Sequence, residues 1–204
     1  MKSAALHHRV RTPSFRGLAL LVCAALSACV ATSPPVQLYR LNALPPVAAP
    51  PAGVTQGIWQ LVLPVSVPEY LDRDAVLVPQ GQSGLQALPG HRWAESLRDS
   101  VPRLLRQDLS VLLGASRVWS APVPAGVVIS RQLRVELTAL DIGAERASVV
   151  LQARWSLADP SATTPPRAEA VALSIPSAGT DVDSLVAAHR LVLWRLAERI
   201  AATP

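Results

Sequence analysis

The segment LRVELTAL, residues 133–140, carries the clearest structural signal in the chain. Its odd-numbered residues are apolar and the residues between them are polar: Leu133, Val135, Leu137 and Ala139 against Arg134, Glu136 and Thr138. A period of two is typical of a strand with one buried face. The same alternation recurs in residues 149–157 and 170–175, so we expect three successive strands in an antiparallel meander with one face covered.

Further strands are predicted on the N-terminal side of this meander. In residues 58–67 the odd-numbered positions are again all apolar, which predicts a half-buried strand. Shorter candidates are residues 36–41, 75–78, 85–88 and 117–119. Residues 44–57, LPPVAAPPAGVTQG, are rich in proline and glycine and predict an extended loop.

Two segments have the spacing of three to four between apolar side chains that is typical of helices. The first begins near Trp93 and ends at Gly114, and Pro102 within it predicts a kink or a restart. The second begins at residues 180–183, TDVD, which are similar to a capping box, and extends to Ile200. The expected fold class is therefore α+β: a single two-layer domain in which two main helices cover a mixed or antiparallel sheet.

The N-terminus has the layout of a secretory signal peptide. Residues 1–16 carry four basic side chains and no acidic one, and an apolar run of 12 residues, 17–28, follows them. That run is too short for a transmembrane helix, which needs about 20 apolar residues. Arg9 and Arg11 are not adjacent, which favours the general secretory route over the twin-arginine route.

The sequence Leu26-Ser27-Ala28-Cys29 resembles the lipobox of bacterial lipoproteins. We expect cleavage between Ala28 and Cys29, and attachment of a diacylglycerol and an N-acyl chain to Cys29, which bind a bilayer essentially permanently. The other cysteine, Cys23, leaves with the signal peptide, so no disulfide forms within the mature chain. The alternative is a soluble secreted protein with Cys29 as a free thiol, which would be a liability in an oxidising compartment.

The lipid anchor sets the expected domain organisation and location. Residues 1–28 are the signal peptide, 29–35 are the lipidated cysteine and a short tether, and 36–204 form one domain. The six tether residues after Cys29 reach roughly 20 Å at most, so the domain would lie close to the bilayer. Val30 stands where an inner-membrane retention signal usually has Asp, and resemblance to that rule predicts the periplasmic face of the outer membrane.

The charge balance narrows the expected partners. Four of the 19 Lys and Arg residues lie in the signal peptide, so 15 basic residues face 14 acidic ones in the mature chain, a net charge of +1. Nucleic-acid binding requires a clustered basic excess. We therefore expect no nucleic-acid partner.

Candidate catalytic and metal-binding residues are few. The mature chain has two histidines, His91 in a predicted loop and His189 beside the apolar stripe of the second helix, which are too few for a zinc site. A serine triad can be assembled from Ser96 or Ser100 with His91 and Asp99, but no G-x-S-x-G turn precedes any serine. We expect no metal and no catalytic residues.

Aromatic and acidic residues have structural interpretations. Each of the five tryptophans falls in a predicted element and is expected in the core, and a membrane-facing position is the alternative for Trp119. Glu69, Asp72 and Asp74 cluster around Arg73 between two predicted strands. Such clusters are usually solvated turns or surface ion pairs.

Residues 61–73, LVLPVSVPEYLDR, join a predicted strand, a proline-bounded turn and the sequence Tyr-Leu-Asp-Arg. In this they resemble the ABC-type transport auxiliary lipoproteins of the paraquat-inducible protein C (PqiC) type. Other short motifs of the chain also stand in the order of that family. They are residues 39–41 (YRL), residues 93–98 (WAESLR) and a long amphipathic helix at the end of the chain. The resemblance covers nearly all of the mature sequence.

The resemblance implies a non-enzymatic outer-membrane lipoprotein that acts as a docking or adaptor subunit. Its partner would be an MCE-type substrate-binding protein of an inner-membrane transport system that moves phospholipids or related apolar molecules, and a homo-oligomeric ring is a further expectation. We predict a contact surface on the loop formed by Glu69, Tyr70, Leu71, Asp72 and Arg73, because a Tyr-Leu pair ringed by charges suits an interface.

Three alternatives to this interpretation stay open. In the first, Tyr70 and Leu71 fill the edge of the core instead of contacting a partner. In the second, the protein is an assembly or stabilising lipoprotein of another envelope complex. In the third, it is a lipid-anchored hydrolase.

Overall fold

The computed structural model describes residues 35–48, 57–163 and 165–203. The expected signal peptide, the expected cleavage site at Ala28 and Cys29, and residues 49–56 of the predicted proline-rich loop lie outside the described residues. The chain from Val36 onward forms one structural unit.

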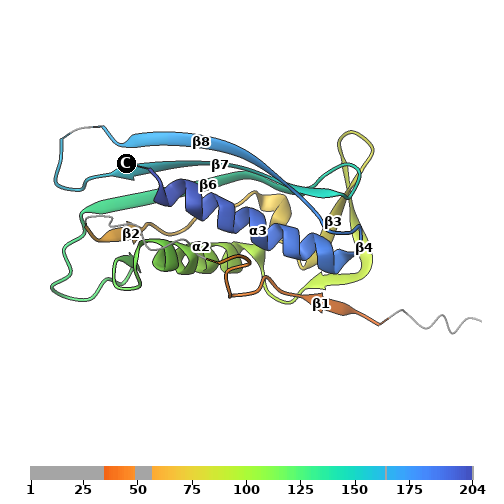
Figure 1. The fold of residues 1–204 in the computed structure, drawn as a ribbon. Helices are drawn as coiled ribbons and strands as arrows, with labels where there is room; N and C mark the ends of the chain where they lie inside the picture. Colours follow the sequence, from red (N-terminus) through yellow and green to blue (C-terminus); the bar gives the residue numbers. More distant parts are fainter. Residues whose placement is uncertain (1–34, 49–56, 164, 204) are drawn as a thin grey trace, which may run out of the picture. The chain divides into compact units, whose positions relative to one another are not determined.

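The strands form two sheets (Figure 1). The larger sheet has the order β5-β2-β6-β7-β8 and consists of β2 (Trp59–Leu61), β5 (Val118–Ser120), β6 (Arg131–Ile142), β7 (Ser148–Ala158) and β8 (Arg167–Pro176). The smaller sheet has the order β1-β4-β3 and consists of β1 (Gln37–Tyr39), β3 (Ala75–Gln80) and β4 (Gly84–Trp93). Strands β6, β7 and β8 pair antiparallel in sequence order, so the predicted meander is confirmed. Strand β2 is parallel to both of its neighbours and β1 is parallel to β4, so both sheets are mixed.

Two helices pack against these sheets (Figure 1). They are α2 (Leu97–Leu113) and α3 (Val182–Ala201), which contact each other as well as strands of the larger sheet. The expected α+β architecture with two main helices is therefore confirmed. Their apolar faces and the inner face of the larger sheet enclose a single core, which includes the fully buried Trp59 and Trp194.

Side-chain caps set the starts of both helices. The Ser96 hydroxyl accepts a hydrogen bond from the backbone N–H of Arg98 at 3.1 Å, and the Asp181 carboxylate accepts one from the N–H of Ser184 at 2.9 Å. Helix α2 continues through Pro102, so the predicted restart does not occur. Proline at this position removes one helical hydrogen bond, and the rest of the helix is held by its buried face.

A bulge in β6 changes which side chains of residues 133–140 are buried. The register shifts between Leu137 and Ala139, and from there the even-numbered Leu140 and Ile142 face the core. The prediction that Ala139 continues the buried set is wrong, because one extra residue in a strand moves all later side chains to the opposite face.

Two further predictions need correction. Strand β2 ends at Leu61 and does not reach residue 67; Pro64 cannot donate to a ladder, and Leu63 is 46% exposed. Pairing resumes only as an isolated bridge between Ser66 and Glu136. Strand β4, by contrast, is longer than the predicted strand at residues 85–88. It runs through residues 89–91, so His91 lies in a strand and not in a loop before a helix.

Four of the five tryptophans are buried, as expected. Trp119 on β5 is half-buried, and its indole N–H donates to the backbone carbonyl of Ser116 at 3.0 Å. Its polar atom is therefore satisfied within the protein.

Candidate functional site

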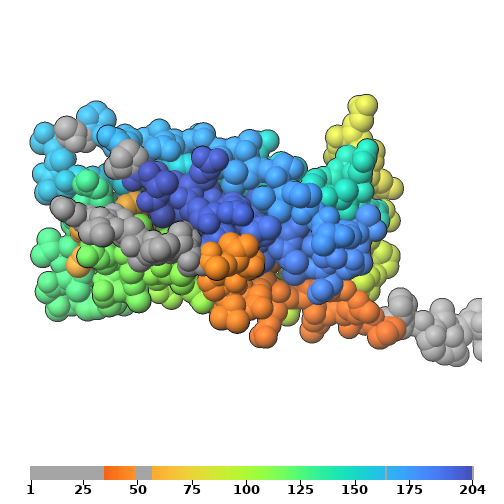
Figure 2. Space-filling model, viewed as in Figure 1, coloured from red at the N-terminus to blue at the C-terminus, as the bar shows by residue number. Residues whose placement is uncertain are grey.

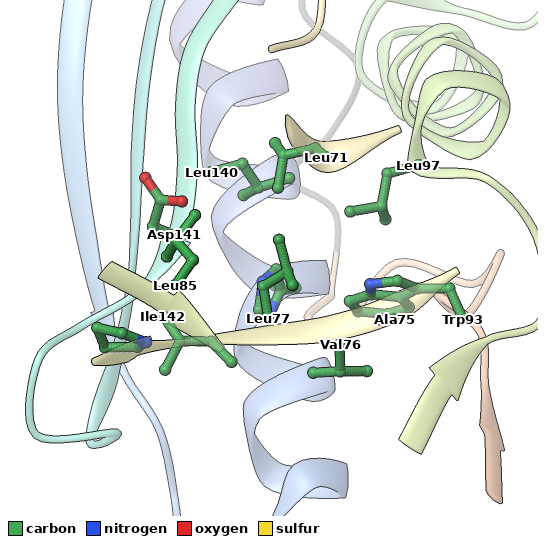
Figure 3. A pocket seen from close by; sticks show the side chains of 12 residues that line it. Leu71, Ala75, Val76, Leu77, Leu85, Trp93, Leu97, Leu140, Asp141 and Ile142 are labelled. Carbon is green, nitrogen blue, oxygen red and sulfur yellow. The ribbon is translucent and has the colours of Figure 1, made fainter. Parts of the chain in front are cut away.

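The predicted contact loop contains a short 3-10 helix, η2 (Glu69–Leu71). Leu71 is buried and lies with Leu140 and Leu97 in the lining of a small pocket (Figure 3). Tyr70 is half-buried, and its hydroxyl donates to the two carboxylate oxygens of Asp141 on β6 at 2.9 and 3.0 Å. Tyr70 and Leu71 thus attach the loop to the edge of the core. This arrangement corresponds to the alternative in which the pair packs within the protein instead of contacting a partner.

The charged side chains of the same loop face solvent. Glu69, Asp72 and Arg73 are all exposed. Asp72 forms an ion pair of 3.3 Å with Arg98 at the start of α2. Glu69 and Arg73 make no ion pair with any other residue that the structure describes, so both charges remain available to a partner.

Burial governs the electrostatics of the Tyr70 contact. The pKa of Tyr70 is raised to about 12. Desolvation is the largest cause, and the hydrogen bond to Asp141 and the negative charge of Asp141 add to it. Desolvation also raises the pKa of Asp141, and the hydrogen bond from Tyr70 opposes that rise. At neutral pH Tyr70 is therefore a protonated donor.

Tyr70→Phe is expected to destabilise the protein by about 1–2 kcal/mol, because it leaves the half-buried Asp141 carboxylate without its donor. Urea unfolding monitored by tryptophan fluorescence measures this loss. Tyr39→Phe is the matched control, since the Tyr39 hydroxyl bonds to the exposed Gln37 and to His91 on the smaller sheet. Equal losses in the two variants would contradict the anchoring role of Tyr70.

The pocket beneath the loop is too small for a substrate. Its volume is about 20 Å³, which is room for roughly one water molecule. Strands β3, β4 and β6 and helices α2 and α3 all contribute to its lining (Figure 3). The pocket is therefore a packing feature and not a binding site for an organic molecule.

The two histidines of the domain have separate environments. His189 is 4% exposed, and its Nδ1 donates to the backbone carbonyl of Leu185 at 2.8 Å. Its ring packs against Trp93 in a T-shaped arrangement with centroids 5.5 Å apart. Burial lowers the pKa of His189 to about 4, so the ring is neutral at neutral pH. His91 stacks on Tyr39, whose hydroxyl lies 2.9 Å from its Nδ1.

The residues from which a serine triad could be assembled have structural roles. Ser96 caps α2 and also donates to Asp72, and Ser100 is fully buried. Within the described part of the chain, no hydrogen bond joins either serine to a histidine. The geometry of a charge-relay site is not formed by these residues.

A buried ion pair joins the two helices, and sequence reasoning missed it. Arg190 on α3 donates from Nη2 and Nη1 to the two carboxylate oxygens of Asp108 on α2 at 2.6 and 2.8 Å. The side chains are 3% and 0% exposed. Burial raises the pKa of Asp108, and Arg190 opposes that rise. The available signal was that each residue interrupts the apolar stripe of its helix, since a charge is rarely buried without a partner.

The same arginine holds the segment that follows β1. Its Nε donates to the backbone carbonyl of Asn42 at 2.6 Å, and Gln107 on α2 donates to the carbonyl of Ala43 at 3.0 Å. Figure 2 shows this segment, in orange, against the blue surface of α3. Arg190 therefore joins three parts of the chain: α2, α3 and the N-terminal segment of the domain.

Metal-binding clusters and membrane-spanning helices are absent from the part of the chain that the structure describes. The described residues contain no group of three or more His, Cys, Asp or Glu side chains arranged to hold a metal ion. Among the described helices, none combines the length and the apolar character needed to cross a bilayer.

The fold defines an α+β domain in which two helices pack against mixed sheets. The family model for the ABC-type transport auxiliary lipoprotein component matches residues 39–201, and the chain belongs to this family. It is therefore an auxiliary lipoprotein component of ABC-type transport. None of the curated proteins compared with it shows significant similarity.

Solved structures share the fold. A crystal structure described as that of an uncharacterized protein aligns with a TM-score of 0.65 at 20% identity, covering 82% of this chain and 97% of that one. A crystal structure of a protein from Xanthomonas campestris aligns with a TM-score of 0.64 at 15% identity, covering 81% of this chain and 92% of that one. At these identities the likeness concerns the fold alone.

Proposed function

We propose that this protein is a PqiC-type docking subunit that links an intermembrane transport system to the outer membrane. The family match over residues 39–201 carries the proposal. The partner is an MCE-type substrate-binding protein, and the transported molecule is a phospholipid or a related apolar molecule. The subunit acts by contact and not by catalysis, which agrees with the structural roles of both histidines.

The anchor in this proposal is the acylated Cys29, left at the N-terminus after removal of residues 1–28. Residues 29–35 form the tether, and residues 36–204 form the domain. The domain's first strand, β1, begins at Gln37, so only a few residues separate the lipid from the folded part. A tether this short keeps the start of the domain within roughly 20 Å of the bilayer surface.

Cross-linking in intact envelopes tests the anchor and the partner together. We expect the wild-type protein to fractionate with the outer membrane and to cross-link to an MCE-type protein, and Cys29→Ser to be lost from that fraction. Mass spectrometry is expected to find acyl chains on Cys29. An unmodified thiol, or a freely diffusing form that still complements a deletion, would contradict the anchor. A cross-link to an unrelated envelope complex would favour the assembly-factor alternative.

The contact surface is proposed on the loop of Glu69, Tyr70, Leu71, Asp72 and Arg73. The buried Leu71 and the hydrogen-bonded Tyr70 hold this loop to the sheet, so its exposed charges are presented in a fixed arrangement. A preorganised surface loses less entropy on binding than a mobile one.

Reversing both loop charges, Asp72→Arg with Arg73→Glu, is expected to reduce co-purification of the MCE-type partner by at least about tenfold, because like charges would then meet across the interface. Arg134→Glu with Glu145→Arg is the matched control, as both residues are exposed on β6 and on the turn after it. Unchanged co-purification with the loop variant would remove this loop from the interface.

A further inference from the structure

A groove of about 620 Å³ lies between the outward face of α2 and the segment where β2 and β5 end. Its apolar lining includes Leu61, Leu63, Pro64 and Pro102. A volume of this size is typical of sites that bind small organic molecules. It is far larger than the water-sized pocket beneath the contact loop.

The polar lining of this groove is mainly cationic. Arg98, Arg103 and Arg106 line it together with one acid, Asp99. Positions three and four apart on a helix share a face, so these side chains project from the same side of α2. The groove therefore combines an apolar wall with a row of guanidinium groups.

Only part of this positive charge is neutralised within the protein. Arg98 pairs with Asp72 at 3.3 Å, and Arg103 pairs with Glu95 at 2.5 Å. Arg106 is half-buried and its guanidinium makes no ion pair with any residue in the described ranges. A half-buried guanidinium presents up to five N–H donors in a geometry that suits phosphate or carboxylate.

We propose that this groove binds an anionic amphiphile, with its phosphate or carboxylate head on Arg106 and Arg103 and its acyl chain along Leu63 and Pro64. Leu63 is 46% exposed, and covering it with a chain would remove apolar surface from water. The cationic row supplies the charge complementarity for the head. This inference rests on the groove alone and does not depend on the proposed docking role.

Binding is tested with residues 29–204 carrying Cys29→Ser, so that no acyl anchor, no detergent and no apolar segment of the expected signal peptide compete for the groove. The probe is dansyl-undecanoic acid, followed by its fluorescence, and its methyl ester is the neutral control. We expect saturable binding of the acid, and binding of the ester that is weaker by about tenfold or more, because a charge-assisted hydrogen bond is lost. Oleoyl lysophosphatidate is expected to displace the acid, and inorganic phosphate at the same concentration is not.

Variants locate the site. Arg106→Gln is expected to raise the Kd of the acid about tenfold, and Arg106→Lys to raise it less, because the charge is kept but the planar fork is lost. Leu63→Gln is expected to weaken the acid and the ester alike. Arg199→Gln, at an exposed position of α3, is the control and leaves the Kd unchanged.

Several results would overturn the proposal. The acid and the ester binding equally well would remove the role of the cationic row. An unchanged Kd in folded Arg106→Gln would move the site elsewhere. Displacement of the acid by inorganic phosphate alone would reduce the groove to an anion site with no role for an acyl chain.

Discussion

Arg190→Leu is expected to lower the free energy of unfolding by about 3–5 kcal/mol. The substitution leaves Asp108, which is 0% exposed, as a buried carboxylate without its partner. An unpaired charge in a protein interior carries its full desolvation cost. Thermal and urea unfolding, followed by far-ultraviolet circular dichroism, measure the loss.

A double variant separates the pair's own contribution from the cost of breaking it. Asp108→Leu with Arg190→Leu is expected to recover most of the stability lost by Arg190→Leu, because well-packed apolar residues replace a buried ion pair with little net cost. Arg154→Leu is the control: Arg154 makes a similar two-bond contact with Glu136, but on the solvated face of the sheet, and its loss is expected to change stability little. Similar losses for Arg154→Leu and Arg190→Leu would contradict the importance of burial.

Arg190→Leu also has a local consequence for the N-terminal segment of the domain. Arg190 Nε holds the carbonyl of Asn42, so its loss frees the chain that follows β1. We therefore expect faster backbone amide exchange in residues 40–44 of Arg190→Leu than in Arg154→Leu, under conditions where both are folded.

The second large effect is a loss of stability in acid that depends on His189. Its pKa is about 4 in the folded protein against an ordinary value of 6.5. Below pH 6.5 the unfolded chain therefore binds a proton that the folded protein does not, and folding becomes less favourable as the pH falls from 6.5 towards 4. The full difference corresponds to roughly 3 kcal/mol.

His189→Met isolates this contribution, because methionine fills a similar volume without a titrating ring. The raised pKa values of Asp108 and Asp141 act in the opposite direction: those groups bind protons more readily in the folded state, so they favour folding as the pH falls. The quantity to compare is thus the difference in unfolding free energy between wild type and His189→Met at pH 7, 6, 5 and 4. We expect the wild type to lose stability relative to the variant below pH 6.5. A difference that is constant with pH would show that His189 is not held neutral by burial.

Some elements of this domain follow from the local sequence pattern, and others depend on packing between segments that are distant in the sequence. The alternation in residues 133–140 and 149–157 predicted β6 and β7 because period two reflects a strand's own geometry. Gly114 and Asp181 likewise marked helix ends through local backbone and capping preferences. The bulge after Leu137 was not predictable, because a register shift depends on the partner strand.

In the candidate site, too, some features follow from the local sequence and others only from the packing of the fold. A Tyr-Leu pair on a loop indicated either a contact or a plug, and no local pattern separates the two. Only the fold brings Asp141, 71 residues away in sequence, within 2.9 Å of the Tyr70 hydroxyl. The cationic groove also arises this way, since α2 supplies its arginines and the chain after β2 supplies its apolar wall.

The secondary structure of the meander and of α3, the α+β class and the resemblance to the transport auxiliary lipoproteins could all be read from the amino-acid order, because they follow from periodicity and from the succession of short motifs. Where charge is buried, and which side chains are free, depends on the assembled fold. Asp108 and Arg190 are 82 residues apart, and burial of a charge is a property of everything that surrounds it. That is why the ion pair, the neutral His189 and an Arg106 without an ion-pair partner among the described residues emerge only when the helices and sheets are packed together.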